Sequence, residues 1–348
     1  MMVCSGKTDI KSLSYEELTE FITGIGEKAF RAKQIYEWMH VKTASGFDEM
    51  TDLSISLRKK LAEECFFCHL EIEKELISSI DGTRKFLFRL YDGNIIESVM
   101  MRYEHGISVC ISSQVGCRMG CRFCASTIDG LERNLTPAEM LEQIYRIQKH
   151  TGERVSHIVI MGSGEPLDNY DNFIRFLRLI TDEKGLNISR RNITASTCGL
   201  TEGICRLADE NTGITLAVSL HAPNDEKRRQ IMPVAFRYSI PEILEACRYF
   251  FEKTGRRLTF EYALIEGVND SVGDADELSR IASGVHAHIN LIPVNPVRER
   301  DYRQSTAHAV AAFREKLEKN GINVTIRREM GRDISGACGQ LRRSYVKE

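Results

Sequence analysis

The sequence predicts an α/β protein built on a partial (β/α) barrel, with a small helical domain ahead of it. From about residue 107 to residue 327, short β-branched runs alternate with amphipathic helical stretches. Polar residues and glycines follow several of these runs, which is where barrel enzymes carry their active sites. Alternating strands and helices imply a parallel sheet with right-handed crossovers. A doubly wound open sheet is the alternative that the same alternation allows.

The expected barrel elements carry their own local signals. Thr136, Pro137 and Glu139 form a helix capping box with proline at the first helical position, and Ser239 opens a second helix in the same way. Gly255 is expected to end that second helix. The expected strands are residues 107–111, 157–161, 192–196, 214–220, 258–264, 288–292 and 323–327.

The chain divides into four expected segments. Residues 1–70 predict a helical N-terminal accessory domain. Residues 71–102 contain two Asp-Gly turn signals between alternating runs, which predicts a strand-rich connector. Residues 103–330 contain the alternating pattern and therefore the barrel, and residues 331–348 form a C-terminal segment.

Composition is that of an ordinary soluble protein. The 348 residues are 42% hydrophobic and 28% charged, and the net charge of −2 argues against non-specific coating of nucleic acid. No apolar run approaches the roughly 20 residues of a membrane span, and the first residues have no apolar signal core. We therefore expect a cytoplasmic protein without membrane contact. A local basic stretch, either a solvated tail or a binding face, contains Arg327, Arg328, Arg332, Arg342, Arg343 and Lys347.

Three of the 11 cysteines form a C-x3-C-x2-C loop shortly after the first barrel strand: Cys117, Cys121 and Cys124. In a reducing compartment, grouped cysteines favour metal or redox chemistry over disulfide bonds. Three close thiolates suit an iron–sulfur cluster with one iron left open. Structural zinc is the main competitor and needs a fourth ligand, for which Cys110 or His105 is available. Incidental burial of the thiols is the third interpretation.

The cysteine loop, with an aromatic residue before its last cysteine, resembles the signature of radical S-adenosylmethionine (SAM) enzymes. Together with MGSGEPLDN, SLHAPND and RDISGACGQL, the segment ISSQVGCRMGCRFCAS resembles the RlmN family of RNA adenine C2-methyltransferases, whose close cousins are the Cfr-type C8 enzymes. The resemblance covers the chain from about residue 20 to its end. It implies a 4Fe–4S cluster on Cys117, Cys121 and Cys124, a fourth iron open to SAM, and two SAM molecules per turnover.

The resemblance also assigns SAM contacts to the ends of the expected strands. Glycines in the turn after the second strand let backbone approach a ligand closely, and a carboxylate there can accept a bond from the SAM amino group. Alone, each polar strand end would be interpreted as a cap or turn. Ser163 stands where related sequences often have methionine or threonine. The residues assigned to SAM are Gly164, Glu165, Ser196, Ser219, Leu220, His221 and Asn295.

Three residues receive catalytic roles from the resemblance. Carbon 2 of adenine is electron-poor and does not attack a sulfonium methyl group, so the family first methylates a C-terminal cysteine, here Cys338. A methylene radical on that sulfur then adds to the base to form a covalent enzyme–RNA adduct. The adduct loses an electron, Glu97 removes the ring proton, and Cys110 attacks the sulfur to form a disulfide and free the methylated RNA. The other cysteines are interpreted as structural: Cys4, Cys65, Cys68, Cys198, Cys205 and Cys247.

The implied substrates are an adenosine of 23S ribosomal RNA near the peptidyl-transferase centre and the adenosine 3′ to the anticodon in transfer RNAs. The N-terminal domain and the basic C-terminal stretch are the expected RNA contacts. We expect a monomer that takes electrons from a donor such as flavodoxin or ferredoxin. Two alternatives stay open: a Cfr-type C8-methyltransferase, against which the pair Glu165-Pro166 argues, and a zinc-stabilised RNA-binding module without catalysis.

Overall fold

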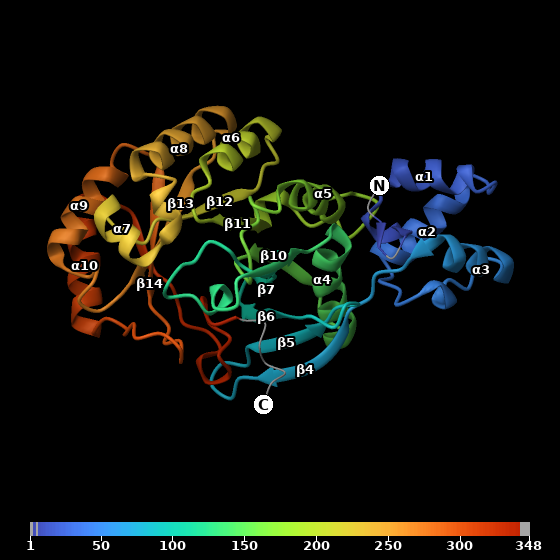
Figure 1. The fold of residues 1–348 in the computed structure, drawn as a ribbon, viewed down its shortest axis with the longest axis horizontal. Helices are drawn as coiled ribbons and strands as arrows, with labels where there is room; N and C mark the ends of the chain where they lie inside the picture. Colours follow the sequence, from blue (N-terminus) through green and yellow to red (C-terminus); the bar gives the residue numbers. More distant parts are fainter. Residues whose placement is uncertain (1–2, 5, 342–348) are drawn as a thin grey trace.

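The centre of the molecule is a sheet that curves into an open, partial barrel (Figure 1). The computed structural model describes residues 3, 4 and 6–341. Seven of the ten strands run parallel and follow one another across the sheet in chain order. They are β7 (Gly106–Cys110), β10 (Val155–Ile160), β11 (Ile193–Thr197), β12 (Thr215–Ser219), β13 (Leu258–Leu264), β14 (Ala287–Pro293) and β15 (Val324–Ile326).

This strand order decides between the two expected architectures. A doubly wound sheet reverses its order at a switch point, whereas here the order never reverses. The partial (β/α) barrel is therefore confirmed and the doubly wound alternative is wrong. Each of the seven strands begins and ends within two residues of its expected bounds.

Three antiparallel strands extend the same sheet beyond β7. They are β4 (Glu71–Ile77), β5 (Arg84–Arg89) and β6 (Ile95–Tyr103), and β6 pairs with β7 so that Val99 lies opposite Cys110. The stretch expected to be a connector is thus an integral part of the central sheet. This pairing brings residues of β6 next to the last residue of β7.

Helices cover the outer side of the parallel strands (Figure 1). The capping boxes at Thr136 and Ser239 are both present, and Gly152 and Gly255 end their helices in the left-handed conformation. The helices are α4 (Pro137–Thr151), α5 (Tyr170–Ile180), α6 (Thr201–Glu210), α7 (Asp225–Ile231), α8 (Ile240–Thr254), α9 (Val272–Ala282) and α10 (Ala307–Lys319). Among the described residues, no helix is long and apolar enough to span a membrane.

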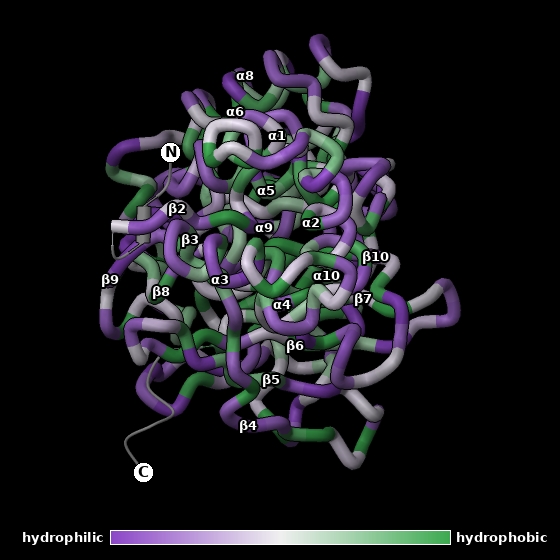
Figure 2. Tube along the Cα trace, turned by 90° about the vertical axis from the view of Figure 1, so that its right-hand side faces the viewer, coloured by the Kyte–Doolittle hydropathy of each residue, from purple (hydrophilic) through white to green (hydrophobic). Residues whose placement is uncertain are grey.

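The N-terminal residues form a separate small unit at one end of the molecule, in front of α4 and α5 in Figure 2. Polar contacts join it to the barrel. In a buried pair, Lys11 Nζ lies 2.5 Å from Glu142 Oε1 on α4, and the Tyr36 hydroxyl donates to Asp182, just after α5, at 2.7 Å. The unit consists of α1 (Tyr15–Gly24), α2 (Phe30–His40), α3 (Ile55–Glu64) and a small sheet of β1 (Val3–Cys4), β2 (Lys7–Asp9) and β3 (Cys65–Phe66).

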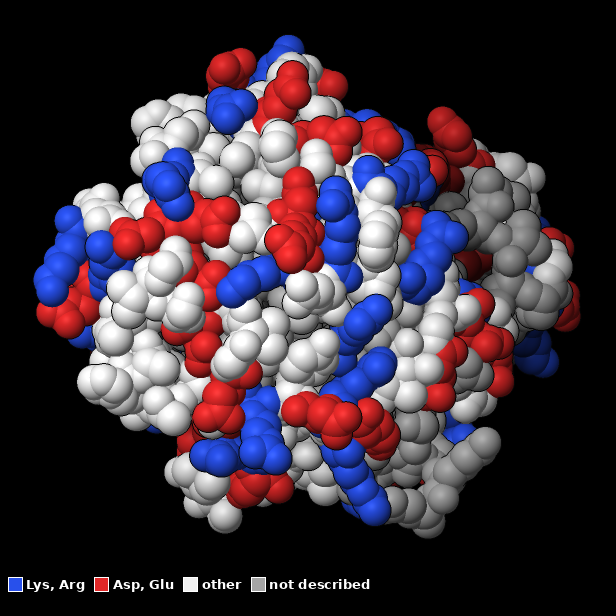
Figure 3. Space-filling model, turned by 60° about the vertical axis from the view of Figure 1, so that its left-hand side comes forward, with Lys and Arg blue, Asp and Glu red and all other residues white. Residues whose placement is uncertain are grey.

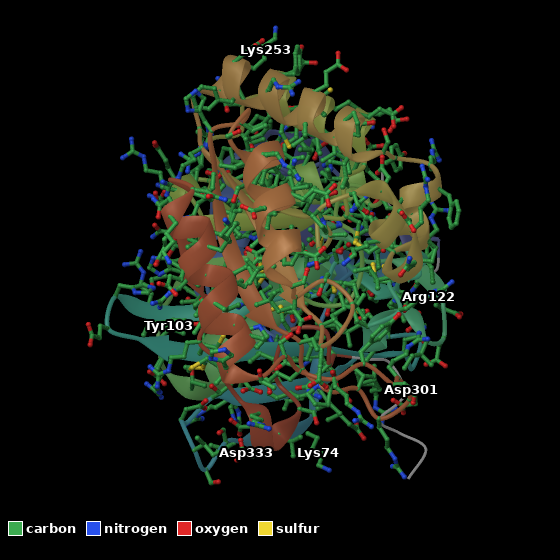
Figure 4. The ribbon with its side chains drawn as sticks, turned by 90° about the vertical axis from the view of Figure 1, so that its left-hand side faces the viewer. Lys74, Tyr103, Arg122, Lys253, Asp301 and Asp333 are labelled. Atoms are coloured by element: carbon green, nitrogen blue, oxygen red, sulfur yellow. The ribbon has the colours of Figure 1, made fainter. Side chains whose placement is uncertain are left out.

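After β15 the chain turns back across the β4–β6 strands. Asp333 accepts hydrogen bonds from the backbone N–H and the hydroxyl of Ser79, in the turn after β4, at 2.9 and 3.0 Å. Figure 4 labels Asp333 at the lower edge of the molecule, where Lys74 of β4 is also labelled. These contacts hold residues 331–341 against the sheet and place Cys338 at the barrel mouth. Three cations of the basic stretch, Arg342, Arg343 and Lys347, lie outside the described residues.

Candidate active site

A cavity of about 130 Å³ opens at the carboxyl ends of the parallel strands. Its walls come from the turns and residues that follow successive strands, as expected for a barrel active site. Both polar groups and sulfur atoms face it. The lining includes Cys121, Cys124, Gly164, Glu165, Ser196, Cys198, Ser219, His221, Glu261, Asn295, Arg327 and Cys338.

The expected cluster loop lies between β8 (Gln114–Gly116) and β9 (Leu131–Asn134). Cys117 opens the loop, and its N–H donates to Gly130 O at 3.0 Å. Gly116 has φ +75°, and an added Cβ would lie 1.9 Å from Gly130 O, so only glycine permits this closure. Cys117 and Cys121 pack in one apolar cluster, with Cys124 against it. The structure therefore packs the three predicted cysteines in one cluster, of which Cys121 and Cys124 line the cavity.

A single structural zinc ion would need a fourth ligand beside the three thiols of the loop. The two candidates for that fourth ligand, Cys110 and His105, lie elsewhere. Cys110 lines another cavity, and the His105 ring packs between Tyr103 and His157, at centroid distances of 5.1 and 4.7 Å.

The glycine-rich turn after β10 forms a narrow cradle. An added Cβ on Gly162 would lie 2.7 Å from Ile111 O, and one on Gly164 would lie 2.6 Å from the Gln114 side chain. Glu165 follows and is buried. Its carboxylate accepts the Cys198 N–H at 2.6 Å and the Leu167 N–H at 3.1 Å. Burial raises the pKa of Glu165 to about 7, despite these hydrogen bonds to the ionised form.

Six of the seven predicted SAM contacts line this cavity. Ser196 and Ser219 end neighbouring strands, and their hydroxyls lie 3.2 Å apart. His221 accepts the Ala263 N–H on Nδ1 at 2.8 Å, and burial lowers its pKa to about 3, so its ring is neutral. Asn295 donates to Cys338 O at 3.0 Å, and its buried Oδ1 has no protein partner within the described residues.

Leu220 is the predicted contact that the cavity lining does not include. Its side chain is fully buried in the main core, and its N–H donates to Glu261 O at 3.1 Å. The Leu220 side chain packs in the core, whereas the side chains of Ser219 and His221 on either side of it line the cavity. The leucine therefore supports the cavity from behind.

A second, smaller cavity of about 70 Å³ adjoins the first and contains the two predicted catalytic cysteines. Cys110 ends β7 and lines this cavity with Val99 and Met101 of β6. Cys338 and Arg327 line both cavities. In Figure 4, Tyr103 of the smaller cavity lies toward the left and Arg122 of the cluster loop toward the right. Cys338 thus stands between the cluster loop and Cys110.

Arg327 is the charged group closest to these sulfur atoms. Its Nη1 donates to Cys338 Sγ at 3.3 Å and to Met161 Sδ at 3.5 Å. The interaction with Cys338 is the main cause that raises the pKa of the guanidinium. Burial raises the pKa of Cys110 to about 12, although Arg327 opposes the shift. Arg327 belongs to the basic stretch for which the sequence leaves a solvated tail and a binding face open, and the structure places it in the lining of both cavities.

Glu97 does not line either of the two cavities. It lies on β6, fully buried, with Oε1 2.8 Å from the Lys85 ammonium on β5. Lys85 also donates to Ser335 O at 3.2 Å, in the segment that carries Cys338. Glu97 shares one face of β6 with Val99, because alternate residues of a strand point the same way. The predicted base therefore lies next to the smaller cavity and reaches the C-terminal segment through Lys85.

Sequence reasoning missed two further residues of the larger cavity. Glu261 is a buried carboxylate whose pKa burial raises, and Asn290 donates to it at 2.9 Å. A charged residue inside the apolar run LTFEYAL was a signal that could have found it. Cys198, interpreted as structural, lines the cavity with its sulfur 3.8 Å from Cys121 Sγ. No sequence signal marks it, because parallel strands bring the two cysteines together.

Two family models match the chain. The model for the Ribosomal RNA large subunit methyltransferase N-terminal domain matches residues 8–67, and that for the Radical SAM superfamily matches residues 111–278. The second range contains the cluster loop and the glycine-rich turn. The partial barrel and its cysteine-lined cavity are therefore those of a radical SAM enzyme.

Full-length relatives identify the family. A protein of Lachnospira eligens named "Probable dual-specificity RNA methyltransferase RlmN" is 62% identical over 98% of this chain and 97% of its own. One of Lachnoclostridium phytofermentans with the same name is 60% identical over 99% and 97%. A solved radical SAM methyltransferase from Sphaerobacter thermophilus is 43% identical, with TM-score 0.93 and coverage of 96% and 99%. The chain belongs to the RlmN family of radical SAM methyltransferases, which confirms the expected family and its cofactors, a 4Fe–4S cluster and SAM.

Proposed function

We propose that this enzyme methylates carbon 2 of an adenosine in 23S ribosomal RNA and of the adenosine 3′ to the anticodon in transfer RNAs, through a methylated Cys338. One observation carries the proposal: Cys338 lines both cavities, so the same sulfur faces the expected cofactor site and the partner thiol Cys110. A residue that receives a methyl group on one side and delivers it on the other needs this position.

The residues of the larger cavity fit the cofactors of the family. Cys117, Cys121 and Cys124 would hold the cluster. The glycine cradle, the Glu165 carboxylate and the unpartnered Asn295 Oδ1 offer SAM a close backbone approach and two acceptors. When bound, the cluster and SAM supply a carbon radical that can abstract hydrogen from a methyl group. The polar contacts come from Gly164, Glu165, Ser196, Ser219, His221 and Asn295.

Arg327 and Cys110 have different proposed roles at the Cys338 sulfur. Arg327 Nη1 donates to Cys338 Sγ at 3.3 Å and holds this sulfur where the two cavities meet. Transfer of a methyl group from SAM to this sulfur would form a thioether and leave S-adenosylhomocysteine. Cys110 lies in the smaller cavity, where burial keeps its thiol protonated until the last step. Attack of Cys110 on the Cys338 sulfur would then form a disulfide and break the bond between that sulfur and the methylene carbon. The carbon keeps the electron pair and takes up a proton, which completes the methyl group and releases the RNA.

Glu97 is proposed to accept the proton that leaves carbon 2, with Lys85 holding the carboxylate toward the C-terminal segment. Glu97→Gln is expected to slow product formation about 100-fold or more in a single turnover, the usual loss when a general base is removed. The covalent protein–RNA species should persist longer in this variant. Glu73→Gln, an exposed carboxylate on β4 that pairs with Arg89, is the matched control. A Glu97→Gln rate equal to that of the parent would assign the base elsewhere.

The Glu165 carboxylate gives SAM binding a pH dependence. Because its pKa is raised to about 7, the ionised form that accepts a hydrogen bond from the SAM amino group is lost as the pH falls through 7. For one such group, affinity should fall roughly eightfold between pH 7.5 and pH 6. Anaerobic calorimetry of SAM binding to the cluster-loaded protein measures this slope. Glu165→Gln should bind more weakly and lose that part of the slope, whereas an identical slope in the variant contradicts the assignment.

The N-terminal unit is proposed to contact RNA. Phe30 at the start of α2 is 54% exposed, and the Arg31 guanidinium lies 4.8 Å from its ring centroid. Exposed aromatic and guanidinium planes suit unpaired bases, which are the usual targets of specific RNA recognition. The barrel face in Figure 3 mixes charges of both signs, so that face has no uniform attraction for a phosphate backbone.

We further propose that the enzyme acts in the cytoplasm as a monomer, with a flavodoxin or ferredoxin as its electron donor.

The test uses purified, cluster-loaded protein with SAM, a reductant and two separate substrates: a 23S ribosomal RNA fragment and a transfer RNA. Nucleoside mass spectrometry should find 2-methyladenosine in both after reaction. Cys338→Ala protein is the matched control and should give none. An 8-methyladenosine product would support the Cfr-type alternative. Methylation of only one of the two RNAs would restrict the proposed substrates to that RNA.

A further inference from the structure

Cys198 has no role in the methyl-transfer steps, yet it lies against the cluster loop. Its Sγ is 3.8 Å from Cys121 Sγ, within the range of a hydrogen bond between sulfur atoms, and it lines the larger cavity. Either sulfur could be the donor in the free thiols. A cysteine that ligates iron is a thiolate and can only accept. With Cys121 bound to the cluster, Cys198 is therefore the donor.

The backbone of Cys198 is fixed independently of its side chain. Its N–H donates to Glu165 at 2.6 Å, and its carbonyl accepts from Arg228 Nη2 at 2.6 Å. Arg228 is fully buried and also donates to Leu220 O and Tyr238 O, at 3.1 and 3.0 Å. A substitution that changes only the thiol leaves all of these bonds in place. The thiol can therefore be removed without moving the strand end that carries it.

We propose that the Cys198 thiol donates a hydrogen bond to the Cys121 thiolate and thereby raises the reduction potential of the cluster. Hydrogen bonds to the sulfurs of an iron–sulfur centre are among the factors that set its potential. A donor stabilises the more electron-rich, reduced state, so the cluster accepts an electron more readily. Cys198 is then a positioning residue for the cluster, one that the spacing of the cysteine loop does not reveal. The inference rests on the cluster but on no RNA step.

The test is a redox titration of the cluster in the absence of SAM and RNA, followed by electron paramagnetic resonance. Parent, Cys198→Ala, Cys198→Ser and Cys205→Ala proteins are loaded with cluster anaerobically, and their iron and sulfide contents are measured first. Cys205 lies on α6, is partly buried and does not line the cavity, so it serves as a matched cysteine control.

All four proteins should carry equal iron. At a fixed solution potential, Cys198→Ala should show about a threefold to tenfold lower ratio of reduced to oxidised cluster, where tenfold corresponds to about 59 mV for a one-electron couple. Cys198→Ser keeps a donor and should stay at or above the parent, and Cys205→Ala should not change. An unshifted Cys198→Ala protein would overturn the proposal. So would loss of iron in that variant, because Cys198 would then be a ligand.

The outcome is separable from the proposed function. A cluster whose potential depends on the Cys198 thiol in a protein that yields no 2-methyladenosine would retain this inference and reject the RNA reaction. An unshifted potential in a protein that does methylate RNA would do the reverse.

Discussion

Cys110→Ala protein is expected to accumulate a covalent adduct with RNA, joined through Cys338. Cys338 carries the methyl group to the base, and Cys110 acts only afterwards, when it attacks the Cys338 sulfur and releases the product. The structure supports this division, because Cys110 lines only the smaller cavity whereas Cys338 also reaches the larger one. Denaturing electrophoresis, nuclease digestion and peptide mass spectrometry would show the adduct and locate it at Cys338.

Cys338→Ala protein is the matched control, because it lacks the sulfur that bonds to the base and should form no adduct. A purely structural role predicts otherwise: both variants would lose roughly 1–3 kcal/mol of stability, and neither would retain RNA. Thermal melting of both proteins separates the two cases. If Cys110→Ala protein leaves the reaction free of RNA while Cys338→Ala still methylates, the two-cysteine account is wrong.

Cys121→Ala protein is expected to lose both the cluster and all methylation. Cys121 packs with Cys117 and lies at the cavity wall. Anaerobic iron and sulfide analysis with the visible absorption spectrum measures cluster content. RNA methylation should fall below detection, since the cluster is needed for the cofactor chemistry.

Cys68→Ala protein is the control for this substitution. Cys68 is buried in the N-terminal unit, and burial raises its pKa well above the ordinary value, so it tests the loss of a buried thiol without a ligand role. It should keep its iron and its activity. Normal iron content in Cys121→Ala protein would remove Cys121 from the cluster assignment.

Much of the fold follows from local patterns. The seven parallel strands were predictable because each is a short apolar run between helix signals such as the capping boxes at Thr136 and Ser239. The sequence predicts a separate connector for residues 71–102. The antiparallel pairing of β6 with β7, which joins this segment to the central sheet, leaves no signal in the local sequence. The three cluster cysteines were predictable because their spacing keeps the thiols together on one loop.

Residues brought to the site by long-range pairing were not predictable in the same way. Arg327 read as one more cation of a basic stretch, and only the pairing of β15 with β14 turns it toward Cys338. Cys198 approaches Cys121 because β11 ends beside the cluster loop. Leu220 stands between Ser219 and His221 in the sequence, but its side chain packs in the core whereas theirs line the cavity. A SAM contact through the Leu220 backbone stays a prediction.

The most direct test of the proposed activity is nucleoside mass spectrometry of ribosomal and transfer RNA from cells that lack this protein. We expect 2-methyladenosine to be absent from both RNAs, to return when the parent chain is expressed, and to stay absent with Cys338→Ala. Unchanged 2-methyladenosine in the deletion strain, or its return with the Cys338→Ala chain, would contradict RNA methylation through Cys338.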